Sequence, residues 1–276
     1  RQEIVFQTLQ YIKQQSISGF EVVLVDQTES IDGNLKYFKS RIFKYKYLRI
    51  TEPGLPNARN VGAENAKGDI LIFIDDDSIP ENDLIQCYMN LFNGDGKDKL
   101  CIGGRIIEKN TTMFKEKDSI VGGWITWYGK TLKNFDTDTS GKCEWAAGGN
   151  FGLTKNLFNE TGGFDSNFIG TAVMEDGDFG YAIQKFGGVV YYYPEPVIEH
   201  LRIQTGGLRQ KAPAKGMFYR AHNSVYFFRK YGRRRFLFFV FLYLNGVALK
   251  ELIKQKHGLS SFIWTWIGFY KGLVTK

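Results

Sequence analysis

The chain of 276 residues contains few cysteines, and their number and spacing exclude two common uses of this residue. Cys87, Cys101 and Cys143 are an odd set, and no two of them form a Cys-x-x-Cys pair. A disulfide framework needs paired cysteines and a structural zinc site needs closely spaced ones, so neither is indicated. The pattern favours a reducing compartment such as the cytosol.

Histidine is equally scarce, with three residues in the whole chain. No grouping of serine, histidine and aspartate, or of cysteine and histidine, indicates a nucleophilic triad.

Long hydrophobic runs are also few. The longest covers residues 236–249, is interrupted by Asn245 and Gly246, and falls short of the roughly 20 residues that a spanning helix needs. No signal peptide is recognisable.

The composition that remains is typical of a folded protein with an anionic partner. Hydrophobic residues make up 43% and charged residues 24%, which predicts a packed core. A net charge of +7 fits nucleic acid, an anionic membrane surface or a phosphorylated substrate. No recognised nucleic-acid motif is present, so a nucleic-acid partner is not expected. Many of the late basic residues lie beside apolar segments: Arg229, Lys230, Arg233, Arg234, Arg235, Lys250, Lys254 and Lys256.

Helix and strand patterns alternate in the first half of the chain. Residues 4–15 have apolar positions at helical spacing, and residues 20–26 form a short apolar run typical of a buried strand. Two further strands are expected at 47–50 and 69–74, with a helix between residues 54 and 68. This alternation predicts an α/β fold with a parallel sheet.

The second half is more mixed. Strand-like runs occur at 100–107 and 188–193, a helix is expected at 176–186, and the chain from residue 216 is helical, aromatic and basic. An open α/β sheet normally begins with a strand, whereas this sequence begins with a helix. We therefore expect a further strand upstream of Arg1.

Carboxylates follow two of the early strands directly. Asp26 ends one strand, and Asp75, Asp76 and Asp77 end another. Ligands of open α/β sheets bind beyond the carboxyl ends of the strands. Adjacent carboxylates repel one another unless a cation lies among them, and such oxygen ligands suit Mg²⁺ or Mn²⁺ shared with substrate phosphates. A solvated acidic turn is the alternative interpretation.

An ordered set of motifs resembles the family 2 glycosyltransferases. Each motif alone is weak, but their order and spacing agree with the family over about residues 1–230. The motifs are GLPNARNVG at 54–62, AKGD at 66–69, FIDDDSIP at 73–80, GGNF at 148–151, GGFD at 162–165, EDGDFG at 175–180 and VIEH at 197–200. The resemblance implies a GT-A fold, with a Rossmann-like mixed sheet flanked by helices and a C-terminal helical extension.

The resemblance also implies the residues that bind the donor. Asp26 would contact the nucleotide base or ribose, and Arg59 would help to hold the nucleotide. A divalent cation, Mn²⁺ or Mg²⁺, would bridge the donor diphosphate to the Asp-x-Asp pair. The implied metal ligands are Asp75, Asp77 and His200, and the other implied donor residues are Asp76, Gly149, Asn150 and Arg209. Arg209 ends a glycine-containing loop that could fold over the diphosphate; a plain flexible loop is the alternative.

Catalysis and acceptor binding are assigned in the same way. Asp176 matches the general base of the family, with Glu175 as its neighbour on the acceptor side. Asp176 could instead cap the following helix. Trp127 and Tyr128 could form an aromatic wall for an acceptor sugar or could belong to the core. The expected activity is inverting transfer (EC 2.4) of a sugar from a nucleotide sugar to a glycan or lipid-linked glycan; the alternative is a non-catalytic binding relative.

The expected domain organisation follows from these assignments. Residues 1–215 would form the catalytic domain, with a nucleotide-binding half at 1–110 and an acceptor half at 111–215. Residues 216–276 would form a helical extension. Basic flanks around apolar and aromatic segments suit an anionic membrane surface, so residues 229–276 are expected to dock there, on the cytoplasmic face of the membrane. Packing on the catalytic domain or a dimer contact are the alternatives.

Overall fold

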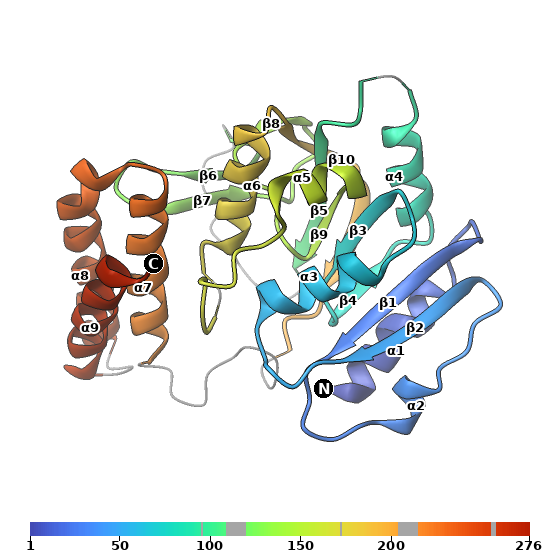
Figure 1. Cartoon of the computed structure of the whole chain (residues 1–276), viewed down its shortest axis with the longest axis horizontal. Coiled ribbons are helices and arrows are strands. Elements are labelled where there is room, and N and C mark those ends of the chain that lie inside the picture. Colours follow the sequence, from blue (N-terminus) through green and yellow to red (C-terminus); the bar gives the residue numbers. More distant parts are fainter. Residues whose placement is uncertain (95, 109–119, 172, 204–214, 255–257) are drawn as a thin grey trace.

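The computed structural model describes residues 1–276 except 95, 109–119, 172, 204–214 and 255–257 (Figure 1). In chain order the elements are α1 (Gln2–Ile12), β1 (Phe20–Asp26), α2 (Gly33–Lys36), β2 (Phe43–Arg49), α3 (Leu55–Asn65), β3 (Ile70–Ile74), β4 (Ser78–Pro80), α4 (Leu84–Phe92), β5 (Leu100–Glu108), β6 (Gly122–Ile125), β7 (Thr131–Asn134), β8 (Gly141–Cys143), β9 (Asn150–Thr154), α5 (Lys155–Thr161), α6 (Glu175–Lys185), β10 (Val189–His200), α7 (Lys215–Lys230), the 3-10 turn η1 (Arg234–Phe236), α8 (Leu237–Ile253) and α9 (Ser260–Val274).

A mixed sheet of six strands forms the centre of the molecule. Its strand order is β3-β9-β5-β10-β4, and β8 pairs with β10. β10 runs parallel to β5, whereas β9 is antiparallel to both β3 and β5. The mixed sheet and the flanking helices confirm the predicted fold class. The strands that belong to this sheet come from both halves of the sequence, so the sheet is not the purely parallel one that the first half alone predicts.

The N-terminal strands form a separate two-stranded sheet. β1 and β2 are parallel, with Phe20 opposite Phe43 and Asp26 opposite Arg49. Their apolar side chains pack with those of α1 around Leu9 and Leu35. Figure 1 shows this layer at one end of the molecule, beside α3 and the central sheet. β1 matches its predicted range of 20–26, whereas β2 begins four residues before its predicted range of 47–50 and ends one residue earlier.

Three helices form the opposite end of the molecule. α7, α8 and α9 pack against one another, and the β6–β7 hairpin reaches toward them from the central part (Figure 1). The buried face of α7 is continuous with the core of the central sheet: Phe227 and Phe228 belong to the same apolar cluster as Phe151 and Phe179. The described residues from 215 onward are therefore mostly helical, as predicted, and they share a core with the part of the chain that precedes them.

The helix that contains the apolar run 236–249 is longer than the run itself. Residues 234–253 are helical without interruption, and they are long and apolar enough to cross a membrane by length and composition. Asn245 does not break the helix, because its side-chain amide donates to the Phe241 carbonyl one turn earlier (2.8 Å). The sequence-based expectation that this segment is too short to span is thus wrong on length alone.

Candidate active site

A cleft with a volume of about 1170 Å³ separates β1 from β3. Among the described residues β1 pairs with β2 and β3 with β9, so the two edges that face the cleft have no strand partner. The strand expected upstream of Arg1 stays a prediction. The cleft is lined by six of the residues that the sequence assigns to donor and metal binding: Asp26, Arg59, Asp75, Asp76, Asp77 and His200. The structure therefore brings together residues that are up to 174 positions apart in the chain.

Strand pairing explains why His200 lies beside the acidic cluster. β3 ends at Ile74, and β4 then pairs with the end of β10 so that Ser78 is opposite His200. His200 Nε2 lies 3.1 Å from Asp77 Oδ1 and 3.9 Å from Asp75 Oδ2. One ligand atom from each of the three residues lies within 4.8 Å of the other two. Two carboxylates and an imidazole at this separation fit a single divalent cation.

The electrostatic environment of this cluster keeps Asp77 ionised. Burial disfavours its charge, but the hydrogen bond and charge of His200, the charge of Arg1 and the Ile203 N–H outweigh burial and lower the pKa to about 2. The hydrogen bond to Asp77 raises the pKa of His200. Burial raises the pKa of Asp75. Asp77 is therefore a carboxylate that His200 holds in place before any ligand binds.

Asp76 and Asp77 also contact the first residue of the chain. Arg1 Nε donates to Asp76 Oδ2 (3.1 Å) and Arg1 Nη1 to Asp77 Oδ2 (3.3 Å). Asp77 thus lies between two basic side chains, because its Oδ2 faces Arg1 and its Oδ1 faces His200. Asp76 faces Arg1, and Asp75 faces His200.

Asp26 lies at the other edge of the cleft, at the end of β1. Its Oδ1 accepts from the Thr28 N–H (2.8 Å) and hydroxyl (2.7 Å), and its Oδ2 accepts from the Tyr47 hydroxyl (2.6 Å). These bonds fix the orientation of the carboxylate. Tyr47 comes from β2 and was not singled out in the sequence, because a tyrosine inside a strand pattern carries no distinguishing signal.

Asp176 begins helix α6 and is held from two sides. Its Oδ1 accepts from Arg59 Nη1 (2.9 Å) and its Oδ2 from the Gly148 N–H (2.9 Å). Met174, two residues before Asp176, has a φ of 79° and turns the chain into the helix. A buried non-glycine residue in this left-handed region is uncommon and is typical of functional sites. The Asp176 side chain remains 23% exposed, so a ligand can reach it.

Gly148 and Gly149 connect this carboxylate to the acidic cluster. A Cβ on Gly148 would lie 2.5 Å from Arg59 Cζ and would also overlap the carboxylate of Asp176. A Cβ on Gly149 would lie 2.7 Å from Asp75 Oδ2. A side chain at either position would therefore displace a functional group, because Arg59, Asp176 and Asp75 approach the backbone there. The two glycines form a loop that lies between Asp176 and Asp75.

Two further motif residues have structural contacts. Asn150 is fully buried; it accepts from the Tyr88 hydroxyl (2.8 Å) and donates to the carbonyls of Arg105 (2.9 Å) and Pro196 (2.8 Å). Its amide joins β9, β5 and β10, and its role at the donor stays a prediction. Asn60 exchanges two 2.8 Å hydrogen bonds with the Phe164 backbone, which holds the GGFD turn against α3.

Glu175 is buried next to Asp176. Its Oε1 lies 3.6 Å from Arg59 Nη1. Burial, and then the charge of Asp176, raise its pKa well above the ordinary value, although Arg59 acts in the opposite direction. Glu175 thus shares Arg59 with Asp176 in a place with little access to solvent. Its predicted contact with an acceptor stays a prediction.

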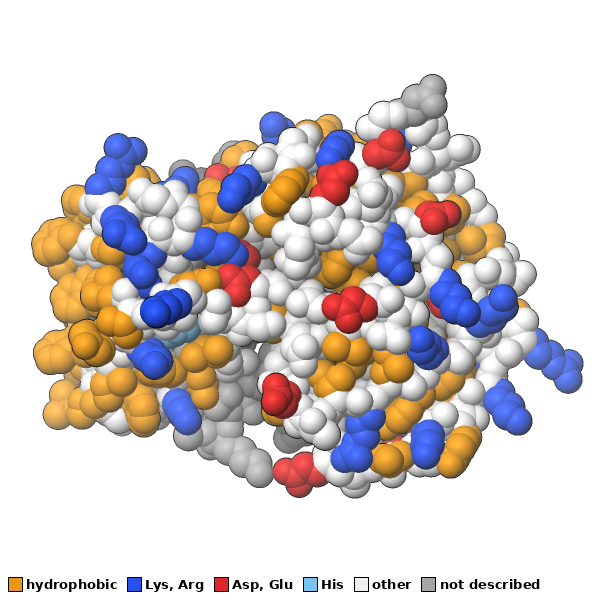
Figure 2. All heavy atoms as spheres, viewed as in Figure 1, with side chains coloured by type: hydrophobic (Ala, Val, Ile, Leu, Met, Phe, Trp, Pro, Cys, Tyr) orange, Lys and Arg blue, Asp and Glu red, His pale blue; other side chains and the backbone are white. Residues whose placement is uncertain are grey.

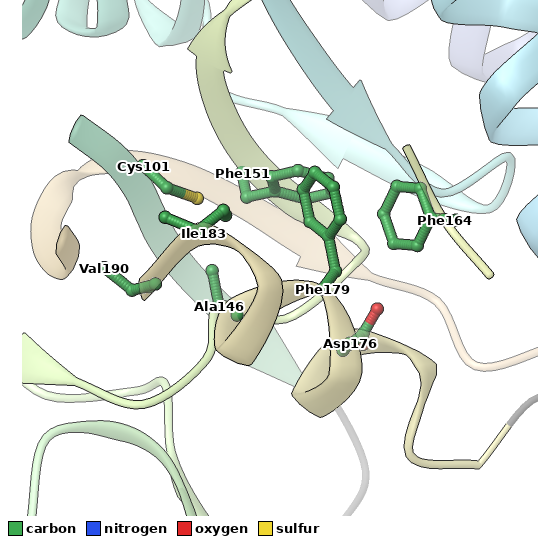
Figure 3. A pocket seen from close by; sticks show the side chains of 9 residues that line it. Cys101, Ala146, Phe151, Phe164, Asp176, Phe179, Ile183 and Val190 are labelled. Carbon is green, nitrogen blue, oxygen red and sulfur yellow. The ribbon is translucent and has the colours of Figure 1, made fainter. Parts of the chain in front are cut away.

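The apolar residues beneath Asp176 form a support and not a second binding pocket. Figure 3 shows Asp176 at the margin of side chains from α6 and the central sheet, with Phe164 and Phe179 close by. These two rings stack at 4.2 Å between centroids, and Arg59 lies over Phe164 at 4.9 Å. The void among them is about 10 Å³, which is too small for more than a single water molecule.

Trp127 and Tyr128 lie at the turn of the β6–β7 hairpin. Trp127 contacts Phe236 and Phe239, and Tyr128 contacts Tyr243, so both pack on η1 and α8. Neither residue lines the cleft. Trp127 is 50% exposed and keeps a free surface. Their assignment to the acceptor site stays a prediction, and Arg209 lies outside the described residues.

Comparisons with known proteins place the chain in a family. The model of "Glycosyl transferase family 2" matches residues 1–158. Polypeptide N-acetylgalactosaminyltransferase 5 of Rattus norvegicus is 26% identical over 196 residues, which are 66% of this chain and 21% of that protein. The chain thus spans about a fifth of the length of this curated relative.

Solved structures share the fold at low identity. S. aureus TarS 1–349 in complex with UDP-GlcNAc has a TM-score of 0.62 and 12% identity, covering 98% of this chain and 76% of that one. The mannosyltransferase PcManGT from Pyrobaculum calidifontis in complex with GDP-Man and Mn²⁺ has a TM-score of 0.57 and 14% identity, covering 99% and 83%. With the family model matching more than half of its length, the chain belongs to glycosyl transferase family 2.

Proposed function

We propose that this protein transfers a sugar from a nucleotide sugar to a glycan or lipid-linked glycan with inversion, with Asp176 as the general base. One observation carries the proposal. The adjacent glycines 148 and 149 contact Asp176 and Asp75 respectively, so the proposed base and the proposed metal ligands lie on the two sides of one loop. A donor held at the acidic cluster would therefore present its sugar near Asp176.

The proposed reaction is a single displacement. The oxygen of an acceptor hydroxyl forms the new bond to the anomeric carbon of the sugar while the bond from that carbon to the diphosphate oxygen breaks. Asp176 accepts the hydroxyl proton, and the leaving diphosphate keeps the electron pair. Within the described part of the chain each Asp176 oxygen accepts from one donor, which leaves acceptor capacity for the hydroxyl. Arg59 and the Gly148 N–H orient the carboxylate.

The donor class is supported by the cleft and by the structural neighbours. TarS and PcManGT were solved with UDP-GlcNAc and GDP-Man, and GalNAc-T7 with UDP, GalNAc and Mn²⁺. In this chain Asp75, Asp77 and His200 would hold the cation, Mn²⁺ or Mg²⁺. A cation there would stabilise the negative charge of the leaving diphosphate as a Lewis acid. Asp26 and Arg59 would contact the nucleotide from the other side of the cleft.

We further propose that α8 and α9 rest on an anionic membrane surface at its cytoplasmic face, where a lipid-linked acceptor would be found. Figure 2 shows apolar side chains gathered over this end of the molecule, with lysines and arginines beside them. The large exposed apolar residues here are Phe238, Phe239, Leu242, Leu249, Ile253, Leu259, Ile263, Trp266, Ile267, Tyr270, Leu273 and Val274. Such a face with basic neighbours suits a membrane interface.

The packing of α8 favours lying on the membrane over crossing it. Val240, Leu244 and Ala248 recur every four residues and are fully buried. Val240 and Leu244 belong to the apolar core that also contains Phe227 and Phe151. One face of α8 is therefore attached to the catalytic part, and the opposite face is left for the lipid.

Calorimetry with UDP, dTDP and GDP, each with Mn²⁺ and with EDTA, tests the proposed function first. We expect one nucleotide to bind in the presence of Mn²⁺ and to lose binding in EDTA. Asp77→Ala should abolish the metal-dependent part, whereas Asp98→Ala, a change of an exposed aspartate elsewhere, should not. Absence of binding by a folded sample would contradict the proposal and favour a non-catalytic relative of the same fold.

A further inference from the structure

The end of helix α7 makes an ionic contact with the first turn of α6, on the side away from the cleft. Lys230 Nζ lies 2.8 Å from Asp178 Oδ1 and 2.8 Å from Asp165 Oδ2. The Tyr231 hydroxyl donates to both the side chain and the carbonyl of Asp178, each at 2.9 Å. Asp178 is only two residues after Asp176.

Helix geometry separates the two aspartates. Residues two apart on a helix point in directions that differ by about 200°, so Asp176 and Asp178 project from nearly opposite sides of one turn. Asp176 is bound by Arg59 and Gly148 at the cleft, and Asp178 by Lys230 and Tyr231 at α7. The first turn of α6 is therefore held between two sets of hydrogen bonds.

The contact with Lys230 is an ion pair in which the carboxylate of Asp178 is buried and the lysine side chain is partly exposed. The Asp178 side chain is 3% exposed, and its burial raises its pKa in spite of the nearby lysine. Lys230 itself also faces the rings of Phe168 and Tyr231 at 5.7 Å. Removal of one partner from a buried pair leaves the other charge without compensation, so the helix turn would have to move to regain solvent.

We propose that Lys230 is a positioning residue: by binding Asp178 it fixes the first turn of α6 and thereby the carboxylate of Asp176. This inference rests on the proposed role of Asp176. The turn has no side-chain cap of its own and begins at Met174 in the left-handed region, so contacts from outside the helix hold it. The helical extension thus contributes to the catalytic geometry although none of its described residues lines the cleft.

Kinetics of Lys230→Met test the proposal, with Lys230→Arg as the conservative variant and Lys99→Met as the matched control. Lys99 pairs with Glu160 of α5 at the surface. The probes are UDP-GlcNAc, UDP-GalNAc and GDP-mannose with Mn²⁺, and the assay follows the release of nucleoside diphosphate to water. We expect kcat of Lys230→Met to fall about tenfold to a hundredfold, as displaced catalytic groups do, with KM and nucleotide Kd nearly unchanged.

Lys230→Arg should recover much of kcat, and Lys99→Met should keep it. A wild-type kcat in Lys230→Met would overturn the inference, as would a parallel loss of kcat and nucleotide binding, which indicates general damage. If Lys230→Met does not fold, Tyr231→Phe takes its place, because it removes two hydrogen bonds from Asp178 without removing a charge.

A second readout needs no turnover. Amide hydrogen exchange of residues 175–180 should become faster in Lys230→Met than in Lys99→Met, because the turn loses its outer contact. Unchanged protection would overturn the inference. Asp176→Asn separates the general-base role of Asp176 from the positioning role of Lys230. Full activity of Asp176→Asn would refute the general-base role. An inactive Asp176→Asn together with a fully active Lys230→Met would refute only the positioning role.

Discussion

Arg59 and Asp176, which are 117 residues apart in the chain, are joined by a 2.9 Å hydrogen bond. Arg59 comes from α3, which lines the cleft, and Asp176 from the first turn of α6. The bond connects the part of the molecule that would hold the donor to the part that would remove the proton. Arg59 is buried and stacked on Phe164, so its position is fixed before substrates bind.

We expect Asp176→Asn to abolish transfer while it leaves nucleotide binding nearly intact. The amide keeps the shape of the side chain but cannot accept the hydroxyl proton, and a general base contributes about 10² to 10⁴-fold to the rate. The measurement compares kcat with the Kd of the nucleotide in Mn²⁺. An equal loss of both quantities would argue that Asp176 has a structural role instead.

Gly148→Ala should reduce activity strongly, because the added Cβ overlaps Arg59 and the Asp176 carboxylate. Gly33→Ala is the matched control: its Cβ would meet no atom within 4 Å. We expect kcat to fall by about tenfold or more for Gly148→Ala and to stay at the wild-type level for Gly33→Ala. Similar kinetics for both variants would show that the loop tolerates a side chain and that its closeness to Asp176 is unimportant.

Glu175 should make the stability of the protein depend on pH. Burial, with the neighbouring charge of Asp176, raises its folded-state pKa well above 4.5. A group whose pKa is raised on folding stabilises the fold below its unfolded pKa, and this contribution is lost as pH rises toward the folded pKa. From about pH 4.5 upward the wild type should therefore lose stability relative to Glu175→Gln, by about 1.4 kcal/mol for each unit of raised pKa.

Urea unfolding of the two proteins at several pH values between about 4.5 and 7.5 measures this difference. The comparison isolates Glu175, because the other titrating groups are present in both chains. Parallel pH profiles would mean that Arg59 compensates the buried charge completely.

The exposed apolar face of α8 and α9 should determine binding to anionic vesicles. We expect the triple variant Phe238→Ser, Ile253→Ser, Ile263→Ser to bind vesicles of phosphatidylglycerol and phosphatidylcholine at least tenfold more weakly, since each change removes an exposed apolar side chain worth about 1.5 kcal/mol or more when buried. Co-sedimentation provides the measurement.

The control for this prediction replaces exposed apolar residues at the other end of the molecule, Ile31, Tyr37 and Met89, with serine. It should bind vesicles as the wild type does. If the triple variant instead binds normally and changes the oligomeric state, the face is a contact between copies of the chain.

The sequence determined the local elements and the family. Apolar periodicity located α1, β1 and β3 to within a few residues, because burial imposes a period of 3.6 on helices and a compact run on buried strands. The adjacent carboxylates after β3 indicated a cation site without any knowledge of the fold. The ordered motifs identified the glycosyl transferase family, which the family model confirms.

Only the tertiary structure decided which of these residues meet. The register of β4 on β10 places His200 against Asp77, and the close approach of α3 to α6 places Arg59 against Asp176. Both depend on contacts between distant parts of the chain, which no local pattern encodes. The same holds for Lys230: in the sequence it is one basic residue among several, and its buried contact with Asp178 exists because α7 packs on the core that supports α6.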